Sequence, residues 1–369
     1  MTKPSKESFK VLEYNNSSLR PKSLVRRLIS RFPRSAQIFR KIRWLPRDLA
    51  VLLIAFRIRC LPEHKRNRLT ITFDAPRADD GTGAQIQRLI AVKAFSLILG
   101  LRYMHSPIEK VAVHPLDPFQ DPLSMAGFIK SLEEQFDFQE DLPLEFSQSI
   151  EINELKLSNL WGIYRQSRNE FPTLIRVLNP YLLVDLLPSY YKKALKTLMH
   201  RLQSQQNTTT KSIAVHYRQG VGGFVVYPGM KVPRQIPIDW YSRRLKKIIK
   251  EDYRNFNVTL YTDAPKKPVT FSPPEDQQHL WVGTPGFSNK NLHISEFDPS
   301  QALSSAVGTL QVKIGGDPLS TIMDISNSDY ILLSRSSLSY VAALLAPKST
   351  KVFYPKDFWH PKLKGWRYL

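Results

Sequence analysis

The chain has 369 residues, more than one ordinary domain holds, and at about 150 residues per domain the length predicts two domains. Apolar residues make up 42% and charged residues 23%, the usual values for a folded protein, so wholesale disorder and collagen-like repeats are excluded. The single cysteine, Cys60, excludes a disulfide framework and any multi-cysteine zinc or iron–sulfur site. It also fits a reducing compartment, and we expect a cytoplasmic protein.

Positive charge is concentrated in the basic N-terminal segment, residues 1–68. This segment holds 18 Lys or Arg against 4 Asp or Glu and accounts for most of the net charge of +21. Apolar residues such as Leu28, Phe32, Phe39 and Trp44 are interleaved with the charges, a pattern typical of stretches that lie on anionic membrane surfaces. A solvated arm, or helices packed on the main body, would have the same composition. Nucleic acid explains the pattern less well, and we expect no nucleic-acid partner.

The sequence contains no candidate for a membrane-spanning helix. The longest apolar run, Leu49 to Phe56, has eight residues, whereas a spanning helix needs about 20. The run also lies too far from the first residue to be the apolar part of a secretory signal. We therefore expect any membrane contact to be peripheral.

Residues 69–209 are expected to form a first α/β domain. The alternating, β-rich run Leu69–Phe73 predicts a strand, and the apolar spacing over residues 84–99 predicts a helix. Residues 102–104 predict a second short strand, which completes a strand–loop–helix–strand unit. Helical patterns recur at 125–136 and 190–202, and the polar stretch 203–210 is the best linker candidate.

Residues 210–369 are expected to form a second α/β domain. Strand and helix patterns alternate along it, which indicates parallel strands joined by crossover helices. The expected strands are 212–217, 257–261, 330–333 and 351–353, and the expected helices are 238–250, 317–325 and 339–345.

Several catalytic motifs are absent from the sequence. It has no P-loop, no His-Glu-x-x-His and no Gly-x-Ser-x-Gly elbow. The eight histidines show no ligand spacing, and no Asp-x-Asp triplet is present. We therefore expect a site that needs neither a metal nor a cofactor.

A glycine-rich segment follows the expected strand 212–217 and reads His216-Tyr-Arg218-Gln-Gly220-Val-Gly222-Gly. Carboxyl ends of strands are where α/β sheets bind ligands. Glycines let backbone amides approach an anion, and the planar fork of Arg218 suits phosphate. The pattern therefore predicts a diphosphate site, and a tight turn with a solvated arginine is the alternative.

Three other turns have the residue types of binding loops. Ser336 and Ser337 stand before the helix 339–345, where hydroxyls and free amides either bind an anion or simply cap the helix. The segment Gly81-Thr-Gly83-Ala-Gln85 joins the first strand to its helix, as a binding loop or as a compact turn. Asp263 follows the strand 257–261, where it either accepts hydrogen bonds from a nucleoside or starts a turn before proline.

Taken in this order, the segments resemble motifs of the α1,2-, α1,6- and protein O-fucosyltransferase superfamily. The matching stretches are Gly81-Thr-Gly-Ala-Gln85, His216-Tyr-Arg-Gln-Gly220, Tyr261-Thr-Asp-Ala264 and Ser334-Arg-Ser-Ser-Leu-Ser339, the last within the similar stretch Asp324–Leu345. The resemblance covers roughly residues 69–110 and 210–350. Gln219, Ala264 and Leu338 depart from the common pattern, in which a second arginine, a second aspartate and a phenylalanine are usual. These departures leave the base and the sugar of the donor open.

The resemblance implies a GT-B-like fold, in which two Rossmann-like domains face each other across a cleft. It also implies an inverting, metal-independent glycosyl transfer from a nucleotide sugar, with GDP-fucose first among the donors, to the hydroxyl of a glycan acceptor. Arg218 would stabilise the leaving diphosphate. The donor-binding residues would be His216, Gly220, Gly222, Asp263, Ser336 and Ser337, and Gly81, Gly83 and Gln85 would face the sugar.

Some roles stay open at the level of sequence. Asp79 and Asp80 are the acidic residues nearest the first glycine loop, and either could be a general base. Arg234 is a second cation near the phosphates or a surface residue in a proline-rich loop. A transferase of the same fold with another nucleotide sugar is the alternative function, and a non-enzymatic protein that binds polyanions or membrane surfaces is the third.

Overall fold

The computed structural model describes residues 53–73, 81–135, 145–152, 157–178, 193–194, 210–219, 235–252, 256–282, 286–307, 309–358, 360 and 362–369. The chain divides into two compact units, Met1–Leu52 and Leu53–Leu369, of which the first lies outside these residues. Also outside them are Gly220, Gly222, Asp79, Asp80, Arg234, nearly all of the linker 203–210 and, apart from residues 193–194, the expected helix 190–202.

The first sheet of the unit Leu53–Leu369 is parallel and has the strand order β2-β1-β4-β3. Its strands are β1 (Leu69–Phe73), β2 (Arg102–Tyr103), β3 (Gln148–Ile152) and β4 (Thr173–Val177). All five residues of β1 are buried, as in parallel sheets covered on both faces. Helix α4 (Thr82–Leu99) joins β1 to β2 and ends at Gly100, whose φ of 69° gives the left-handed cap that glycine adopts readily. Helix α6 (Leu157–Gln166) joins β3 to β4.

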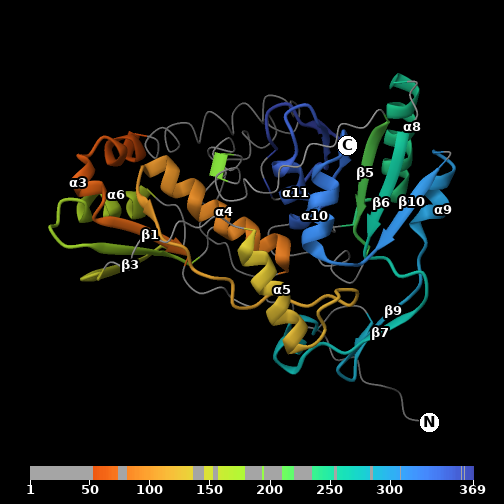
Figure 1. The fold of residues 1–369 in the computed structure, drawn as a ribbon, viewed down its shortest axis with the longest axis horizontal. Helices are drawn as coiled ribbons and strands as arrows, with labels where there is room; N and C mark the ends of the chain where they lie inside the picture. Colours follow the sequence, from red (N-terminus) through yellow and green to blue (C-terminus); the bar gives the residue numbers. More distant parts are fainter. Residues whose placement is uncertain are drawn as a thin grey trace, which may run out of the picture. The chain divides into compact units, whose positions relative to one another are not determined.

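The second sheet is also parallel, with the order β10-β6-β5-β11-β12-β13, of which Figure 1 labels β5, β6 and β10. Its strands are β5 (Lys211–Tyr217), β6 (Phe256–Thr262), β10 (Leu310–Ile314), β11 (Tyr330–Leu332), β12 (Lys351–Tyr354) and β13 (Arg367–Tyr368). Counted along the chain, this is the order 3-2-1-4-5-6 of a nucleotide-binding doubly wound sheet. The helices between the strands are α8 (Ile238–Asp252), α9 (Pro299–Ser304), α10 (Pro318–Ser326) and α11 (Ser337–Leu345). The expected α/β class with two Rossmann-like sheets is confirmed.

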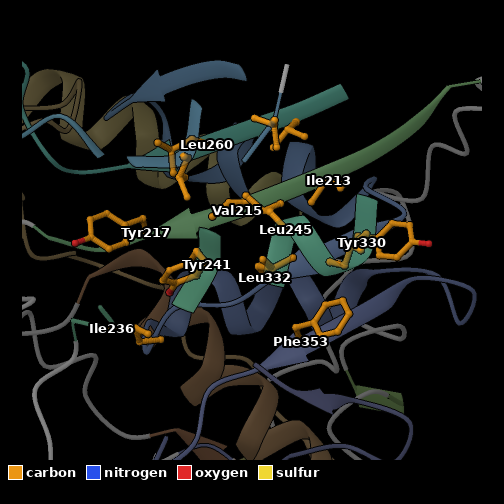
Figure 2. Packing of buried hydrophobic residues seen from close by; sticks show 14 residues of the cluster. Ile213, Val215, Tyr217, Ile236, Tyr241, Leu245, Leu260, Tyr330, Leu332 and Phe353 are labelled. Carbon is orange, nitrogen blue, oxygen red and sulfur yellow. The ribbon is translucent and has the colours of Figure 1, made fainter. Parts of the chain in front are cut away.

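One face of the second sheet packs against α8 and α9. Ile213, Val215 and Tyr217 of β5 point to this face and meet Tyr241 and Leu245 of α8 (Figure 2). The Tyr241 hydroxyl donates to the carbonyl of Leu333 at 3.1 Å, which ties α8 to the end of β11. Successive residues of a strand point to opposite faces, so Ala214 and His216 of β5 lie on the other face.

A small antiparallel sheet, which the sequence analysis does not predict, is inserted between β6 and β10. Its order is β7-β9-β8, with β7 (Val269–Phe271), β8 (Phe287–Ser288) and β9 (Asn291–Ile294), and the 3-10 helix η4 (Glu275–Leu280) lies between β7 and β8. Phe271, Trp281 and Leu292 pack around Val113 from the segment after β2. The amide of Val113 also donates to Gln277 Oε1 at 2.9 Å. The insertion therefore holds the segment that runs from β2 to α5.

The other described helices come before β1 or between β2 and β3 in the sequence. Residues 53–59 are helical, and α3 (Glu63–Arg66) follows them. Helix α5 (Pro122–Glu134) begins after the capping residue Asp121, and its first residue lies three residues before the predicted start. None of the helices in the described part of the chain has the length and apolarity needed to cross a bilayer.

Candidate active site

The candidate site lies at the carboxyl edge of the second sheet, between β5 and β11. At this point the strand order reverses, because the connections run to one side from β5 and to the other side from β11. Such a switch point is where open α/β sheets bind their ligands. The structure brings residues of all four predicted segments together here: the segments that begin at His216 and Ser334 lie side by side, and Asp263 and Gly83 contact them.

His216 is buried at the end of β5. Its Nδ1 lies 2.6 Å from Ser334 Oγ, which is itself 3.5 Å from Ser339 Oγ in α11. Burial lowers the pKa of His216 to about 4; the charge of Arg218 also lowers it, and the charge of Asp263 opposes both. The ring is therefore neutral at pH 7, and His216 acts there as a hydrogen-bonding group rather than as a cation.

Arg218 follows β5 and points toward the start of α11. Its Nη1 donates to Ser336 Oγ at 3.4 Å, and its Nε lies 3.7 Å from Asp263 Oδ2. The side chain is only 13% exposed, and the buried Nε makes no hydrogen bond with any described residue. A buried donor without a partner costs about 1–3 kcal/mol, and an anion beside it would supply the missing acceptor. The arginine therefore fits the expected diphosphate.

Asp263 follows β6 and holds the turn after β5. Its Oδ1 accepts from the amide of Gln219 at 2.7 Å, and its Oδ2 faces Arg218. These contacts fix the course of the chain at Arg218 and Gln219. A nucleoside contact by Asp263 stays a prediction.

The start of α11 lacks the side-chain cap that α5, α9 and α10 have. Ser336 is the N-cap residue but makes no capping bond with its side chain, which contacts Arg218 instead. In contrast, Asp121, Asp298 and Asp317 accept hydrogen bonds from the first amides of α5, α9 and α10. Ser337 Oγ lies 3.1 Å from His360 Nε2. Simple serine capping therefore does not account for the serines of this segment.

The start of α4 packs directly on the start of α11. A Cβ at Gly83 would stand 2.8 Å from the carbonyl carbon of Ser337 and still closer to the backbone of Leu338, so only glycine fits. The N-cap residue of α4, Gly81, offers no side-chain acceptor either. Each helix start carries about half a positive charge. Two such ends in contact near Arg218 bring three positive groups to this edge of the sheet, and Asp263 partly balances the charge of the arginine.

Two other residues of the first glycine segment have contacts within the protein. Gln85 lies in the first turn of α4, is fully buried and donates from Nε2 to the carbonyl of Lys110 at 3.4 Å. A Cβ at Gly81 would stand 2.8 Å from His114 Nε2. These contacts place the segment after β2 against the start of α4. A sugar-facing role for Gly81, Gly83 and Gln85 stays a prediction.

Asp117 is a site residue that the sequence analysis missed. Its Oδ2 accepts from the amide of His114 at 2.8 Å, within a turn closed by the bond from Asp117 N to His114 O at 3.0 Å. Burial raises the pKa of its carboxyl to about 7; the bond from His114 and the charge of Arg218 lower it, while the charges of Asp263 and Asp317 raise it. The neighbouring Leu116 accepts from the amide of Gly316, which follows β10, so Asp117 lies at the carboxyl edge of the second sheet. No motif marks it.

Arg335, within the serine segment, is a structural residue. Its Nε and Nη2 donate to the carbonyl of Lys356 at 3.1 and 3.0 Å, and its Nη1 donates to the carbonyl of Gln235 at 3.3 Å. Only 6% of the residue is exposed. The two arginines at this edge thus differ, because Arg335 spends its donors on backbone carbonyls. Within the described residues, no group of three or more His, Cys, Asp or Glu is placed to hold a metal ion.

Comparison with known proteins finds similarity in structure only. No protein-family model and no curated protein matches the sequence. A crystal structure of POFUT1 in complex with GDP matches with a TM-score of 0.42 and 10% identity, over 78% of this chain and 97% of that chain. E. coli heptosyltransferase WaaC with ADP-2-deoxy-2-fluoro heptose matches with a TM-score of 0.35 and 10% identity, over 82% of this chain and 92% of that chain. The predicted likeness to glycosyltransferase structures is therefore found, at the level of fold alone, and at these TM-scores it assigns neither a family nor a substrate.

Proposed function

We propose that the protein is a glycosyltransferase that binds the diphosphate of a nucleotide sugar at Arg218. The observation that carries the proposal is the meeting of Arg218 with two helix starts, those of α4 and α11, at the switch point of the second sheet. Three positive groups at one edge of the sheet suit an anion, and a diphosphate supplies two adjacent negative groups. The motif resemblance adds that this diphosphate belongs to a sugar donor.

The proposed reaction displaces the nucleoside diphosphate from the anomeric carbon with inversion. The acceptor oxygen forms a bond to this carbon while the bond to the β-phosphate oxygen breaks, and the leaving electron pair increases the negative charge on that phosphate. Arg218 stabilises this charge, together with the amides at the start of α11. Loss of one such preorganised donor typically costs a factor of about 100–1000 in rate.

GDP-fucose is the donor that we propose first, because the motifs resemble those of fucosyltransferases. The second candidate is another nucleotide sugar, since Gln219 and Ala264 depart from the common pattern. The acceptor would be a glycan hydroxyl, and the reaction would proceed without a metal. Turnover that is unchanged in EDTA would support a metal-independent reaction, and turnover that needs a divalent cation would contradict it.

Nucleotide binding tests the proposal directly. A ligand at 100 times its Kd stabilises a protein by about 2.7 kcal/mol, which a thermal shift detects. We expect GDP to raise Tm in the wild type and not in Arg218→Ala. The same measurement with UDP, ADP and CDP shows which base the site prefers. Arg243→Ala, which removes an exposed arginine of α8, is the matched control and should keep the shift. A wild-type protein whose Tm responds to none of the four nucleotides would contradict the proposal.

We also propose a second role, attachment to an anionic membrane surface, on a separate observation. Phe56 is 64% exposed and Trp161 36% exposed, although both are large apolar residues. The guanidinium of Arg165 lies 5.9 Å from the Trp161 ring, and that of Arg168 lies 5.2 Å from the Tyr164 ring. Exposed aromatic rings paired with arginines suit the interface of an anionic bilayer.

The same region carries further cationic side chains. The pKa of Tyr164 is lowered by the hydrogen bond from Arg168 and by the charges of Arg168, Arg57 and Lys65. We call the residues Phe56, Arg57, Lys65, Trp161, Tyr164, Arg165 and Arg168 the basic aromatic patch. In sequence, it begins directly after the basic residues 1–52.

Vesicle sedimentation tests this second role. We expect the protein to sediment with phosphatidylserine vesicles at low salt and not with phosphatidylcholine vesicles. The double variant Arg165→Glu, Arg168→Glu should weaken the binding, whereas Arg243→Glu, Lys247→Glu on α8 makes the same charge change elsewhere and should not. Equal sedimentation with both kinds of vesicle would contradict the role.

A further inference from the structure

The segment between β2 and α5 is fixed at three places around the candidate site. The amide of Val113 donates to Gln277, and Lys110 forms an ion pair with Asp276, so one end is held by η4. The ring of His114 lies against Gly81 at the start of α4.

The third attachment is at the end of β10. The amide of Gly316 donates to the carbonyl of Leu116 at 3.4 Å, and a Cβ at Gly315 would stand 2.7 Å from the Leu116 side chain. These attachments leave Asp117 little freedom. Its carboxyl lies near charged residues that follow β5, β6 and β10, although Asp117 itself comes from a different segment of the chain.

The surroundings of Asp117 suit a proton acceptor. One oxygen, Oδ2, accepts from the amide of His114, and Oδ1 has no hydrogen-bond partner among the described residues. The charged and titratable groups that face the carboxyl are His114 in its own turn, Arg218 after β5, Asp263 after β6 and Asp317 at the start of α10. Asp263 and Asp317 already accept hydrogen bonds from backbone amides of the protein. Asp117 differs from both, because Oδ2 of Asp263 faces Arg218 and Asp317 caps α10, whereas the carboxyl of Asp117 has neither of these contacts among the described residues.

We propose that Asp117 is the general base that takes the proton from the acceptor hydroxyl, a role that rests on the proposed transferase function. As the acceptor oxygen bonds to the anomeric carbon, its proton passes to Oδ1 of Asp117, and the electron pair of the broken bond goes to the phosphate oxygen beside Arg218. The protonated carboxyl then returns the proton to solvent, so the enzyme is regenerated. The base and the leaving-group cation therefore come from different parts of the fold and meet at the same sheet edge.

A pKa near 7 is what such a base needs. It leaves the carboxylate ionised in part of the molecules at neutral pH and makes it a stronger base than an ordinary aspartate. The rate should then rise with pH, with a midpoint near pH 7, and level off above it. This acid limb is a signature that a merely structural carboxylate would not produce.

Donor hydrolysis provides a test that needs no known acceptor, since water then takes the place of the hydroxyl. The probe is GDP-fucose, followed by UDP-glucose and an ADP-sugar, with released nucleotide measured from pH 5.5 to 8.5. We expect Asp117→Asn to reduce release at least about 100-fold and to remove the acid limb, while the GDP-induced Tm shift stays. The asparagine can still accept from the His114 amide, so the turn is kept.

Three further variants complete the test. Asp117→Glu retains a carboxylate and should recover part of the rate. His114→Gln should keep the acid limb, because the titrating group is the aspartate. Asp121→Asn, on an exposed helix cap four residues away, should behave as the wild type, since asparagine caps a helix as well as aspartate.

The outcomes separate the two proposals. Release by Asp117→Asn at the wild-type rate, or with the same acid limb, overturns the role of Asp117 and leaves the transferase function standing. Nucleotide binding without any hydrolysis in the wild type also overturns the role, because a base beside the anomeric carbon acts on water as well. A wild type that binds no nucleotide and hydrolyses no donor overturns the proposed function itself, and the role of Asp117 with it.

Discussion

The Nε of Arg218 lies 3.7 Å from Oδ2 of Asp263, close enough for the charges to attract and too far for a hydrogen bond. The carboxylate therefore orients the guanidinium without using its donors. We expect Arg218→Ala to reduce turnover by about 100–1000-fold with little change in Tm, since the buried Nε makes no hydrogen bond within the part of the chain that the structure describes. Arg218→Lys should restore only a small part, because an ammonium lacks the planar fork. Turnover near the wild-type level in Arg218→Ala, measured by nucleotide release, would remove this residue from the mechanism.

Gly83 permits the contact between α4 and α11. We expect Gly83→Ala to lower Tm and to weaken nucleotide binding, because the new Cβ would collide with the backbone at Ser337 and Leu338. Gly127→Ala in α5 is the matched control, since a Cβ there meets nothing within 4 Å. Alanine is favoured over glycine inside a helix by about 0.5–1 kcal/mol, so the control should be as stable as the wild type or more stable. Equal Tm values for the two variants would contradict the close contact.

His216 should make the protein sensitive to acid. Its pKa of about 4 in the folded state lies below the ordinary value of 6.5, so the folded state binds the proton less well than the unfolded chain. The stability due to neutral His216 is complete above about pH 6.5 and is lost as the pH falls toward 4, by on the order of 2–3 kcal/mol. Denaturant unfolding across this range should show a smaller decline in His216→Asn than in the wild type. Parallel curves would show that the histidine does not titrate in this way.

Asp117 should have the opposite dependence on pH. Its folded-state pKa of about 7 lies above the ordinary value of 3.8, so the folded state holds the proton more tightly than the unfolded chain. This contribution to stability is complete below about pH 3.8 and is lost as the pH rises through 7. The Tm of Asp117→Asn relative to the wild type should therefore increase from pH 4 to pH 8. A difference that is constant with pH would contradict the raised pKa, whatever the activity of the variant.

Arg335 should matter for stability rather than for chemistry. Its donors go to the carbonyls of Lys356 and Gln235, and Arg335→Ala leaves these carbonyls without those bonds. We expect a loss of about 2 kcal/mol or more in the free energy of unfolding, measured with urea. Nucleotide affinity at a temperature where the variant is folded should stay close to that of the wild type. Loss of affinity without loss of stability would reverse the assignment.

The sequence predicts the parts of the fold that have local signals. Strand β1 is predicted to the residue, because Leu69–Phe73 alternates and is bounded by polar residues. The helices α8 and α10 are predicted within two residues at each end, since their apolar spacing is regular. Helix α4 begins at Thr82, two residues before the predicted start, because Gly83 is accepted into the helix for its packing on α11. Tertiary contact overrides the low helix propensity of glycine there.

Other parts depend on contacts between distant segments, and no local pattern shows them. The antiparallel insertion is built from strands of two to four residues, which packing around Val113 stabilises. Ser336 has the residue type of a helix cap, and only the fold shows that its side chain contacts Arg218 instead. Asp117 lies in a turn with no motif, and only the fold brings it near the residues that follow β5, β6 and β10. The sequence therefore points to the proposed diphosphate side of the site and not to the proposed base.

Strand β5 lies in the sheet beside β11, which is made much later as the chain is synthesised. The amide of Ser212 donates to Asp329 Oδ2, a partner 117 residues further along. Contacts of such long range are slow to form, because the intervening chain must first be ordered. On the ribosome, the Arg218 turn is complete long before the serines that face it have been translated. A prematurely terminated product that ends before β11 would expose one edge of β5 to pairing with other chains, and we expect it to aggregate.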